Sequence, residues 1–254
     1  MIDEELRSYI DSLSIGSAYD LGFEDEEIDA NAADVDELPQ AFVTGRNLIA
    51  AETGVSALTR SIVALSLLAA QRVADNDDRV KSPDDWIAQH NKVLKKLNWM
   101  QSHSAYVTKK FNKKDLFVHE AVIPLLEAAI GGPTGAMTII TTVLTQLKNI
   151  DKSSPWITVF SNESRRFDIE EYHFSTLEEK DGLATLSMAA ARFGADFKHK
   201  QVLFVKIKKI DAEFQLASSK LESNVALLEE MNIALKKKLG RQTSAYIKDL
   251  DVGG

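Results

Sequence analysis

The first 150 residues carry apolar side chains at intervals of three, four and seven positions, which is the spacing of one helix face. Between Arg46 and Asp75 this pattern predicts one long buried helix, bent at Gly54. A second helix is predicted to begin at Ser82-Pro83, where a capping hydroxyl precedes proline and two acids. The apolar side of this second helix is predicted to carry Trp86, Ile87, Val93, Leu94 and Leu97.

The segment 118–147 is the most apolar part of the chain, and a Gly-Gly-Pro-Thr-Gly corner at residues 131–135 divides it. Glycine and proline in this arrangement predict a turn between two helices. We therefore expect an αα-hairpin with arms at 118–130 and 136–147.

Beyond Pro155 the period changes from helical to alternating, which is typical of half-buried strands. Helical spacing returns from Leu221 to Leu239, and three lysines followed by Gly240 favour a helix end there. A short last helix is expected at 246–250. The predicted strands cover 156–160, 167–174, 184–190, 202–208 and 214–216.

These elements predict an α+β fold in three segments. An acidic N-terminal arm occupies 1–40, and a helical domain with the apolar αα-hairpin occupies 41–152. The third segment, 153–254, is a β-sheet domain with a C-terminal helix, and we expect its sheet to be antiparallel with four or five strands.

Charge is spread unevenly along the chain. Residues 1–40 hold 13 acids and one base, a balance of −12, whereas the remainder carries +4 within the total of −8. The arm is interpreted either as a solvated tail or as a segment that docks on a basic surface of this chain or of a partner. The N-terminus is acidic, and no charge-free apolar run reaches about 20 residues. We therefore expect a chain that is cytoplasmic or released without a signal peptide.

The sequence offers few candidates for catalysis. It has no cysteine, which excludes disulfides, thiol chemistry and cysteine-ligated metal centres. The glycines lack the spacing of nucleotide loops, and the histidines form no metal-binding pair. We predict no catalytic residue, no metal and no cofactor. An enzyme built from scattered residues is the third hypothesis, with His173 and Glu170 or Glu171 as its nucleus.

Two further patterns have ordinary structural interpretations. Asp75 begins a run that is typical of a calcium loop, but Val80 stands where that loop needs glycine and Trp86 where it needs glutamate. Lysines interleave with aromatic residues at 106–114, as in some phosphate-binding surfaces. The chain is acidic, with an isoelectric point near 5.2, which disfavours nucleic acid as a partner.

The apolar hairpin has two interpretations. It is either a buried core pair or a pair of helices that inserts into a membrane. Each arm is only about 18–20 Å long, so partial insertion is expected over full spanning. The residues predicted to contact a membrane or a partner are Ile130, Gly131, Gly132, Pro133, Gly135, Ile139, Ile140 and Val143.

Taken together, the sequence predicts a non-enzymatic macromolecular interaction protein, of the kind of a bacterial effector or accessory factor. The alternative is a soluble membrane-active toxin that uses the hairpin at 118–147. The expected partner is accordingly a protein or a lipid membrane, with the oligomeric state left open. Fold class alone does not choose between these functions.

Overall fold

The computed structural model describes residues 4–16, 34–103, 105–111, 115–132, 134–194, 203, 206–207 and 213–250. Nine strands form one mixed sheet, whose main path runs β3-β8-β7-β6-β2-β1-β9. The strands are β1 (Ala41–Thr44), β2 (Asn47–Ala51), β3 (Met100–His103), β4 (Val107–Lys110), β5 (Arg165–Arg166), β6 (Ile169–Lys180), β7 (Leu183–Phe193), β8 (Glu213–Asn224) and β9 (Ile247–Asp249).

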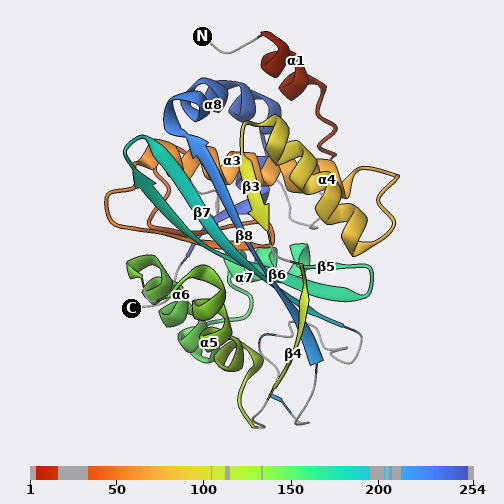
Figure 1. Ribbon diagram of the computed structural model, residues 1–254, viewed down its shortest axis with the longest axis vertical. Helices are drawn as coiled ribbons and strands as arrows, with labels where there is room; N and C mark the ends of the chain where they lie inside the picture. The colour runs from red at the N-terminus through yellow and green to blue at the C-terminus, as the bar shows by residue number, and fades with distance from the viewer. Residues whose placement is uncertain are drawn as a thin grey trace.

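Helices cover both faces of this sheet (Figure 1). They are α1 (Glu4–Ser12), α3 (Ala57–Asp75), α4 (Pro83–Lys96), α5 (Val118–Ile130), α6 (Gly135–Gln146), α7 (Pro155–Glu163), α8 (Val225–Leu239) and α9 (Gln242–Tyr246), with a 3-10 turn η2 (Leu147–Asn149). The predicted α+β fold, with an αα-hairpin and a C-terminal helix, is confirmed.

The two faces of the sheet support separate cores. The first face, which carries Leu177, Leu186 and Leu221, packs against α3, α4 and α8. The second face, which carries Phe174 and Phe193, packs against α5, α6 and α7. Successive residues of a strand point to opposite faces, so one long strand such as β6 contributes to both cores.

The central strands are joined in an order that the sequence did not predict. β6, β7 and β8 are antiparallel neighbours, whereas β2 runs parallel to β6, with Asn47 opposite His173. The sheet therefore contains strands from both sides of the segment boundary predicted at 152/153. The division into domains itself stays a prediction.

The helix predicted from Arg46 is wrong in its first part. Residues Asn47–Ala51 form β2, and every one of them is buried. A strand that is covered on both faces has no polar alternation, so its apolar run resembles a buried helix. The helix α3 begins only after Ser56, whose side chain accepts a hydrogen bond from the Thr59 N–H.

The strand predicted at 156–160 is also wrong, because these residues belong to α7. Pro155 occupies the first turn, where its fixed φ suits a helix. Trp156, Ile157 and Phe160 recur at helical spacing and are buried in the core of the second face. Packing of that stripe outweighs the β preference of the branched and aromatic side chains.

Near the C-terminus, the predicted helix boundaries are displaced. Leu221 belongs to β8, which runs to Asn224, and the Asn224 side chain then caps α8. The last helix predicted at 246–250 is wrong, because β9 occupies Ile247–Asp249 after the short α9. The predicted strand at 202–208 lies mostly outside the described residues, and so do half of the acidic arm and Pro133.

In the described part of the chain, one helix is long and apolar enough to cross a membrane, namely α3. Of its apolar window, 83% is buried inside the protein. The core of the first face therefore accounts for the composition of this helix.

Candidate functional site

The first face of the sheet changes from apolar to polar along β6, β7 and β8. Beyond the leucines that meet α3 and α8 come three more rows, of which the first two carry mostly short side chains. Read from β6 to β8, the rows are Ser175-Met188-Ser219, His173-Ala190-Ala217 and Glu171-Arg192-Gln215. The short side chains leave space between this part of the sheet and α4.

That space is a pocket of about 230 Å³. Its floor is made by Ala190, Ala217 and Ser219, and α4 covers it with Trp86 and His90. Tyr106, in the link between β3 and β4, closes one side. The pocket thus lies between elements that are far apart in sequence.

Local sequence fixes how α4 lies over the pocket. The Ser82 side chain accepts a hydrogen bond from the Asp85 N–H, and Pro83 begins the helix, as predicted. Trp86 and His90 are one turn apart, so their rings stack at 4.9 Å between centroids. The Arg46 guanidinium lies over the Trp86 ring at 3.9 Å.

The indole of Trp86 is anchored at its polar end. Its Nε1–H donates to the Asp75 Oδ1 at 2.8 Å, and that carboxylate also receives Arg166 Nη1 at 2.6 Å and Arg72 Nη1 at 3.4 Å. Asp75, which begins the calcium-like run in the sequence, therefore binds arginines and an indole. These bonds hold the aromatic wall of the pocket in place.

Glu163, at the end of α7, lies beside the same cluster of charges. Its Oε2 is 3.2 Å from Arg72 Nη1. Burial, and then the negative charge of Asp75, nevertheless raise the pKa of Glu163 to about 7. This carboxyl group therefore titrates near neutral pH.

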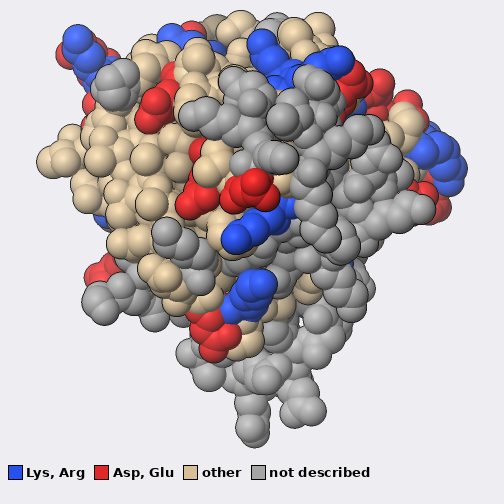
Figure 2. All heavy atoms as spheres, turned by 90° about the horizontal axis from the view of Figure 1, so that it is seen from below, with Lys and Arg blue, Asp and Glu red and all other residues tan. Residues whose placement is uncertain are grey.

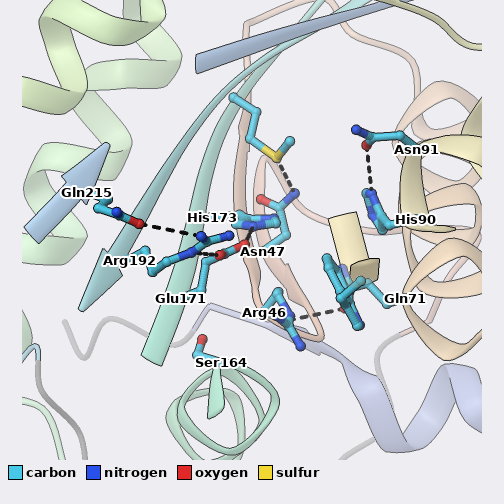
Figure 3. A network of polar contacts seen from close by, with 12 residues as sticks. Arg46, Asn47, Gln71, His90, Asn91, Ser164, Glu171, His173, Arg192 and Gln215 are labelled. Atoms are coloured by element: carbon cyan, nitrogen blue, oxygen red, sulfur yellow. Dashed lines mark hydrogen bonds and ion pairs between the residues drawn. The ribbon is translucent and has the colours of Figure 1, made fainter. Parts of the chain in front are cut away.

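Glu171 is the centre of a second buried network (Figure 3). One of its carboxylate oxygens lies 2.8 Å from His173 Nε2, and the other accepts from Arg192 Nε at 2.7 Å. Although burial opposes ionisation, the hydrogen bond and charge of His173 and the charge of Arg192 lower the pKa of Glu171 to about 2. Glu171 is thus a fixed negative charge beneath the pocket.

Arg192 connects the network around Glu171 to the rim of the pocket. Its Nη1 is 3.2 Å from the exposed Asp84 at the start of α4 and 3.4 Å from Gln215 Oε1. Its guanidinium also lies over the Tyr106 ring at 4.0 Å. Burial, together with the nearby charge of Glu171, raises the pKa of Tyr106, so its hydroxyl stays protonated.

His90 is a neutral histidine in the wall. Burial, and then the positive charge of His173, lower the pKa of His90 to about 3. Its Nδ1 is 3.3 Å from Asn91 Oδ1, and that oxygen also accepts from Gln101 Nε2 at 3.0 Å. The His90 and His173 ring centroids are 6.5 Å apart.

Three buried polar atoms, which belong to residues that line the pocket, have no hydrogen-bond partner among the described residues. They are His90 Nε2, His173 Nδ1 and Ser219 Oγ. The two imidazoles are 2% and 3% exposed, so their nitrogens are nearly cut off from bulk water. Buried polar atoms are normally satisfied, and those left without partners call for an explanation.

The sequence singled out His173 with Glu170 or Glu171, and the structure separates the two acids. Glu171 shares the first face with His173, because the two are two positions apart on β6. Glu170 points to the second face, where it binds Arg165 at 3.0 Å and the Tyr172 hydroxyl. The sequence missed His90, Trp86, Tyr106 and Arg192 as members of this site.

The predicted contact residues of the hairpin lie apart from the pocket. Ile140 and Val143 are buried against the second face, while Ile130 and Ile139 are half-buried. Gly131 and Gly135 are exposed at the corner, and Gly131 has the positive φ that favours glycine at a helix end. Gly132 is partly exposed, and Pro133 lies outside the described residues.

The outer surface of the hairpin is mostly uncharged, as Figure 2 shows over the α5 and α6 side of the molecule. Its exposed positions include Thr138, Thr142 and Thr145. The three threonine hydroxyls donate to carbonyl oxygens one turn earlier in α6. The hairpin is thus amphipathic, with its large apolar groups on the sheet.

Comparisons with known proteins give little guidance. No protein-family model matches the sequence, and no curated protein matches it. Among solved structures, the chain is similar to one described as "Structure of the Evf virulence factor", with 14% identity and a TM-score of 0.39. That match covers 97% of this chain and 91% of the other.

Proposed function

We propose that this chain is a non-enzymatic binding protein that holds a small organic molecule in the pocket beneath α4. The observation that carries the proposal is the pair of buried imidazoles, His90 and His173, which line one pocket and each keep one ring nitrogen without a hydrogen-bond partner among the described residues. A buried polar atom without a partner costs about 1–3 kcal/mol. A ligand that supplies hydrogen bonds to both rings would offset that cost.

The size of the pocket supports a small ligand. Typical sites for drug-sized molecules measure about 300–1,000 Å³, and an engineered apolar cavity of about 150 Å³ binds benzene. The pocket of about 230 Å³ lies between these values. It therefore suits a molecule with one or two rings.

The arrangement around His173 supports binding over catalysis. A general base is oriented by a carboxylate that stabilises the imidazolium as it forms. Here the Glu171 carboxylate is shared with Arg192, whose Nε is 2.7 Å away, so much of its negative charge is already neutralised. Glu171 consequently positions the ring more than it drives proton transfer. The enzyme hypothesis stays open to the same experiments.

Filling the pocket tests the proposal. Ala217 lies on its floor, so Ala217→Leu should weaken the binding of phenol, toluene or benzylamine at least tenfold, measured by titration calorimetry or ligand-observed NMR. Ala88→Leu, at an exposed position of α4, is the matched control and should leave binding unchanged. Equal affinities in both variants, or no binding of any probe by the unmodified chain, would overturn the proposal.

The expectations of a macromolecular partner and of membrane activity stay predictions. The neutral surface and exposed glycines of the hairpin suit contact with a protein partner. Insertion into a membrane would have to remove Ile140 and Val143 from the second face, where both are buried. A liposome leakage assay at about pH 5 and about pH 7 tests that alternative. No dye release at either pH would reject it.

A further inference from the structure

We propose that Met188 sets the size of the ligand that the pocket accepts, limiting it to a single ring, and that Asn47 holds Met188 in this position. This inference rests on the proposed function and adds a specificity-determining residue and the size class of the ligand. Met188 lines the pocket and is buried. Among the described strand residues that line the pocket, Met188 has the only long apolar side chain.

The space over β7 lies above Ala190, whose side chain is short. Alternate residues of a strand share a face, so the neighbours of Ala190 on this face are Met188 and Arg192. A ligand that is longer than the space above Ala190 would press on one of these two side chains. The resistance of each side chain therefore decides which ligands fit.

On one side of Ala190, the position of Arg192 is fixed by charge. Its Nε is 2.7 Å from Glu171 Oε2, and its Nη1 is 3.2 Å from Asp84 Oδ1. Hydrogen bonds between ionised groups are shorter and stronger than those between neutral groups. A ligand that displaced the guanidinium would have to break both contacts, so the pocket does not extend in this direction.

On the other side, Met188 is held by one neutral amide. Asn47 Nδ2 donates to Met188 Sδ at 3.6 Å, and Asn47 Oδ1 accepts from Ser175 Oγ at 2.9 Å. A thioether is a weak acceptor, and methionine is an adaptable side chain when nothing fixes it. Asn47, which is fully buried, is thus a positioning residue for Met188.

The row beyond Met188 offers no further space. It consists of Leu177, Leu186 and Leu221, which belong to the core of the first face. Protein cores are close-packed, so a ligand would not pass these leucines. Removal of the Met188 side chain should therefore lengthen the pocket by the volume of that side chain alone.

Two ligands that differ by one fused ring, phenol and naphthol, test the inference by titration calorimetry. The unmodified chain should bind phenol at least as tightly as naphthol, although naphthol has more apolar surface to bury. Met188→Ala removes Cγ, Sδ and Cε, so the affinity for naphthol should rise about tenfold while that for phenol changes by less than about threefold.

The outcomes separate this inference from the proposed function. An unchanged affinity for naphthol in Met188→Ala, or a preference for naphthol in the unmodified chain, would overturn the inference while leaving the proposed function in place. Failure of both ligands to bind either protein would overturn the proposed function itself.

Two further variants control for stability and for volume. Met137→Ala removes the same atoms from a methionine in the core of the second face, so the affinity for naphthol should not change. Met188→Leu keeps a side chain of similar volume and should bind naphthol about as weakly as the unmodified chain. A tenfold rise in either variant would contradict the role of Met188.

Asn47→Ala tests the positioning role. It should raise the affinity for naphthol about threefold in the unmodified chain, because Met188 can then move aside, but should add nothing when Met188 is already alanine. An equal rise in both backgrounds would show that Asn47 acts independently of Met188.

Methyl NMR of the unmodified chain gives a test that needs no variant. The chain has five methionines, and the Met188 methyl resonance should shift when phenol binds beside it. The Met137 methyl, on the second face, should not. A Met188 resonance that stays in place at saturating phenol would overturn the inference.

Discussion

The two faces of the sheet are built from the same three long strands, yet they carry side chains of different size along the same stretch. On the second face, aromatic rings meet in a continuous cluster, with Phe160 and Tyr172 at 5.0 Å and Phe193 and Phe214 at 5.6 Å between centroids. On the first face, the corresponding stretch carries Ala190 and Ala217 opposite each other. The pocket therefore arises from side-chain size at a few register positions.

This difference separates residues that stabilise the fold from residues that are available for binding. Protein interiors are normally close-packed, and buried polar atoms are normally paired. At the pocket on the first face, the cavity lies beside His90 and His173, each of which keeps one ring nitrogen without a partner among the described residues. Local departures of this kind are expected at functional sites.

The largest effect is expected from removing an aromatic ring on the packed face. Phe174 is fully buried, so Phe174→Ala should lower the free energy of unfolding by about 3–5 kcal/mol, measured by urea denaturation. Ala217→Leu on the open face should change it by no more than about 1 kcal/mol, because the added carbons enter existing space. A large loss for Ala217→Leu would show that the pocket is too tight to accept a ligand.

A smaller loss is expected from breaking the buried network on the first face. Glu171→Gln leaves Arg192, whose side chain is 11% exposed, without a counter-charge from that position, and should cost about 3 kcal/mol. Glu170→Gln is the matched change on the second face. Its partner Arg165 is 33% exposed, so water can compensate and the loss should be about 1 kcal/mol. Equal losses would show that the network has no special role.

Helices and strands were predictable where the spacing of apolar residues along the sequence was unambiguous. Leu186 and Met188 alternate on β7, and Ser82-Pro83 marks the start of α4, as the sequence predicted. Prediction failed at β2, where burial on both faces removes alternation, and at α7, where tertiary packing outweighs β propensity.

Only part of the site was visible in the sequence. Glu171 and His173 are two residues apart on a strand, so their proximity follows from the period alone. The positions of His90 and Tyr106 depend on how α4 and the β3–β4 link cross the sheet. The contact of Arg192 with Glu171 depends on the register between β6 and β7. One sequence does not give those relations.

The contributions of His90 and of Glu163 to the stability of the fold should also vary with pH in opposite directions. The pKa of His90 is lowered from 6.5 to about 3 in the folded chain, so its contribution to stability is present above 6.5 and is lost as pH falls through about 3. The pKa of Glu163 is raised from 4.5 to about 7, so its contribution is present below 4.5 and is lost as pH rises through about 7. Between about pH 4.5 and 6.5 the two groups change the free energy of unfolding in opposite directions, so their effects partly cancel.

Substitutions at His90 and at Glu163 distinguish the contributions of the two groups. In His90→Phe, the free energy of unfolding should fall as pH rises through this window, because the lowered pKa of His90 no longer opposes the raised pKa of Glu163. In Glu163→Gln it should instead rise with pH, because His90 remains. Denaturant titrations at several pH values give both slopes. Parallel curves for the two variants would contradict the assignment.

The smallest effects compare the two helix caps that face opposite sides of the sheet. Ser82 caps α4 over the pocket, and Thr134 caps α6 on the packed face, each through a backbone N–H at 3.1 Å. Ser82→Ala and Thr134→Ala should each lower the free energy of unfolding by about 1 kcal/mol.

Their effects on ligand binding should differ, because of these two helices α4, and not α6, lines the pocket, through Trp86 and His90. Fraying of its first turn would loosen Trp86, so Ser82→Ala should weaken phenol binding several-fold while Thr134→Ala leaves it unchanged. Calorimetric titration of the two variants at one temperature, with both fully folded, makes the comparison. Equal weakening by both would mean that global stability controls the affinity, and that the position of α4 does not.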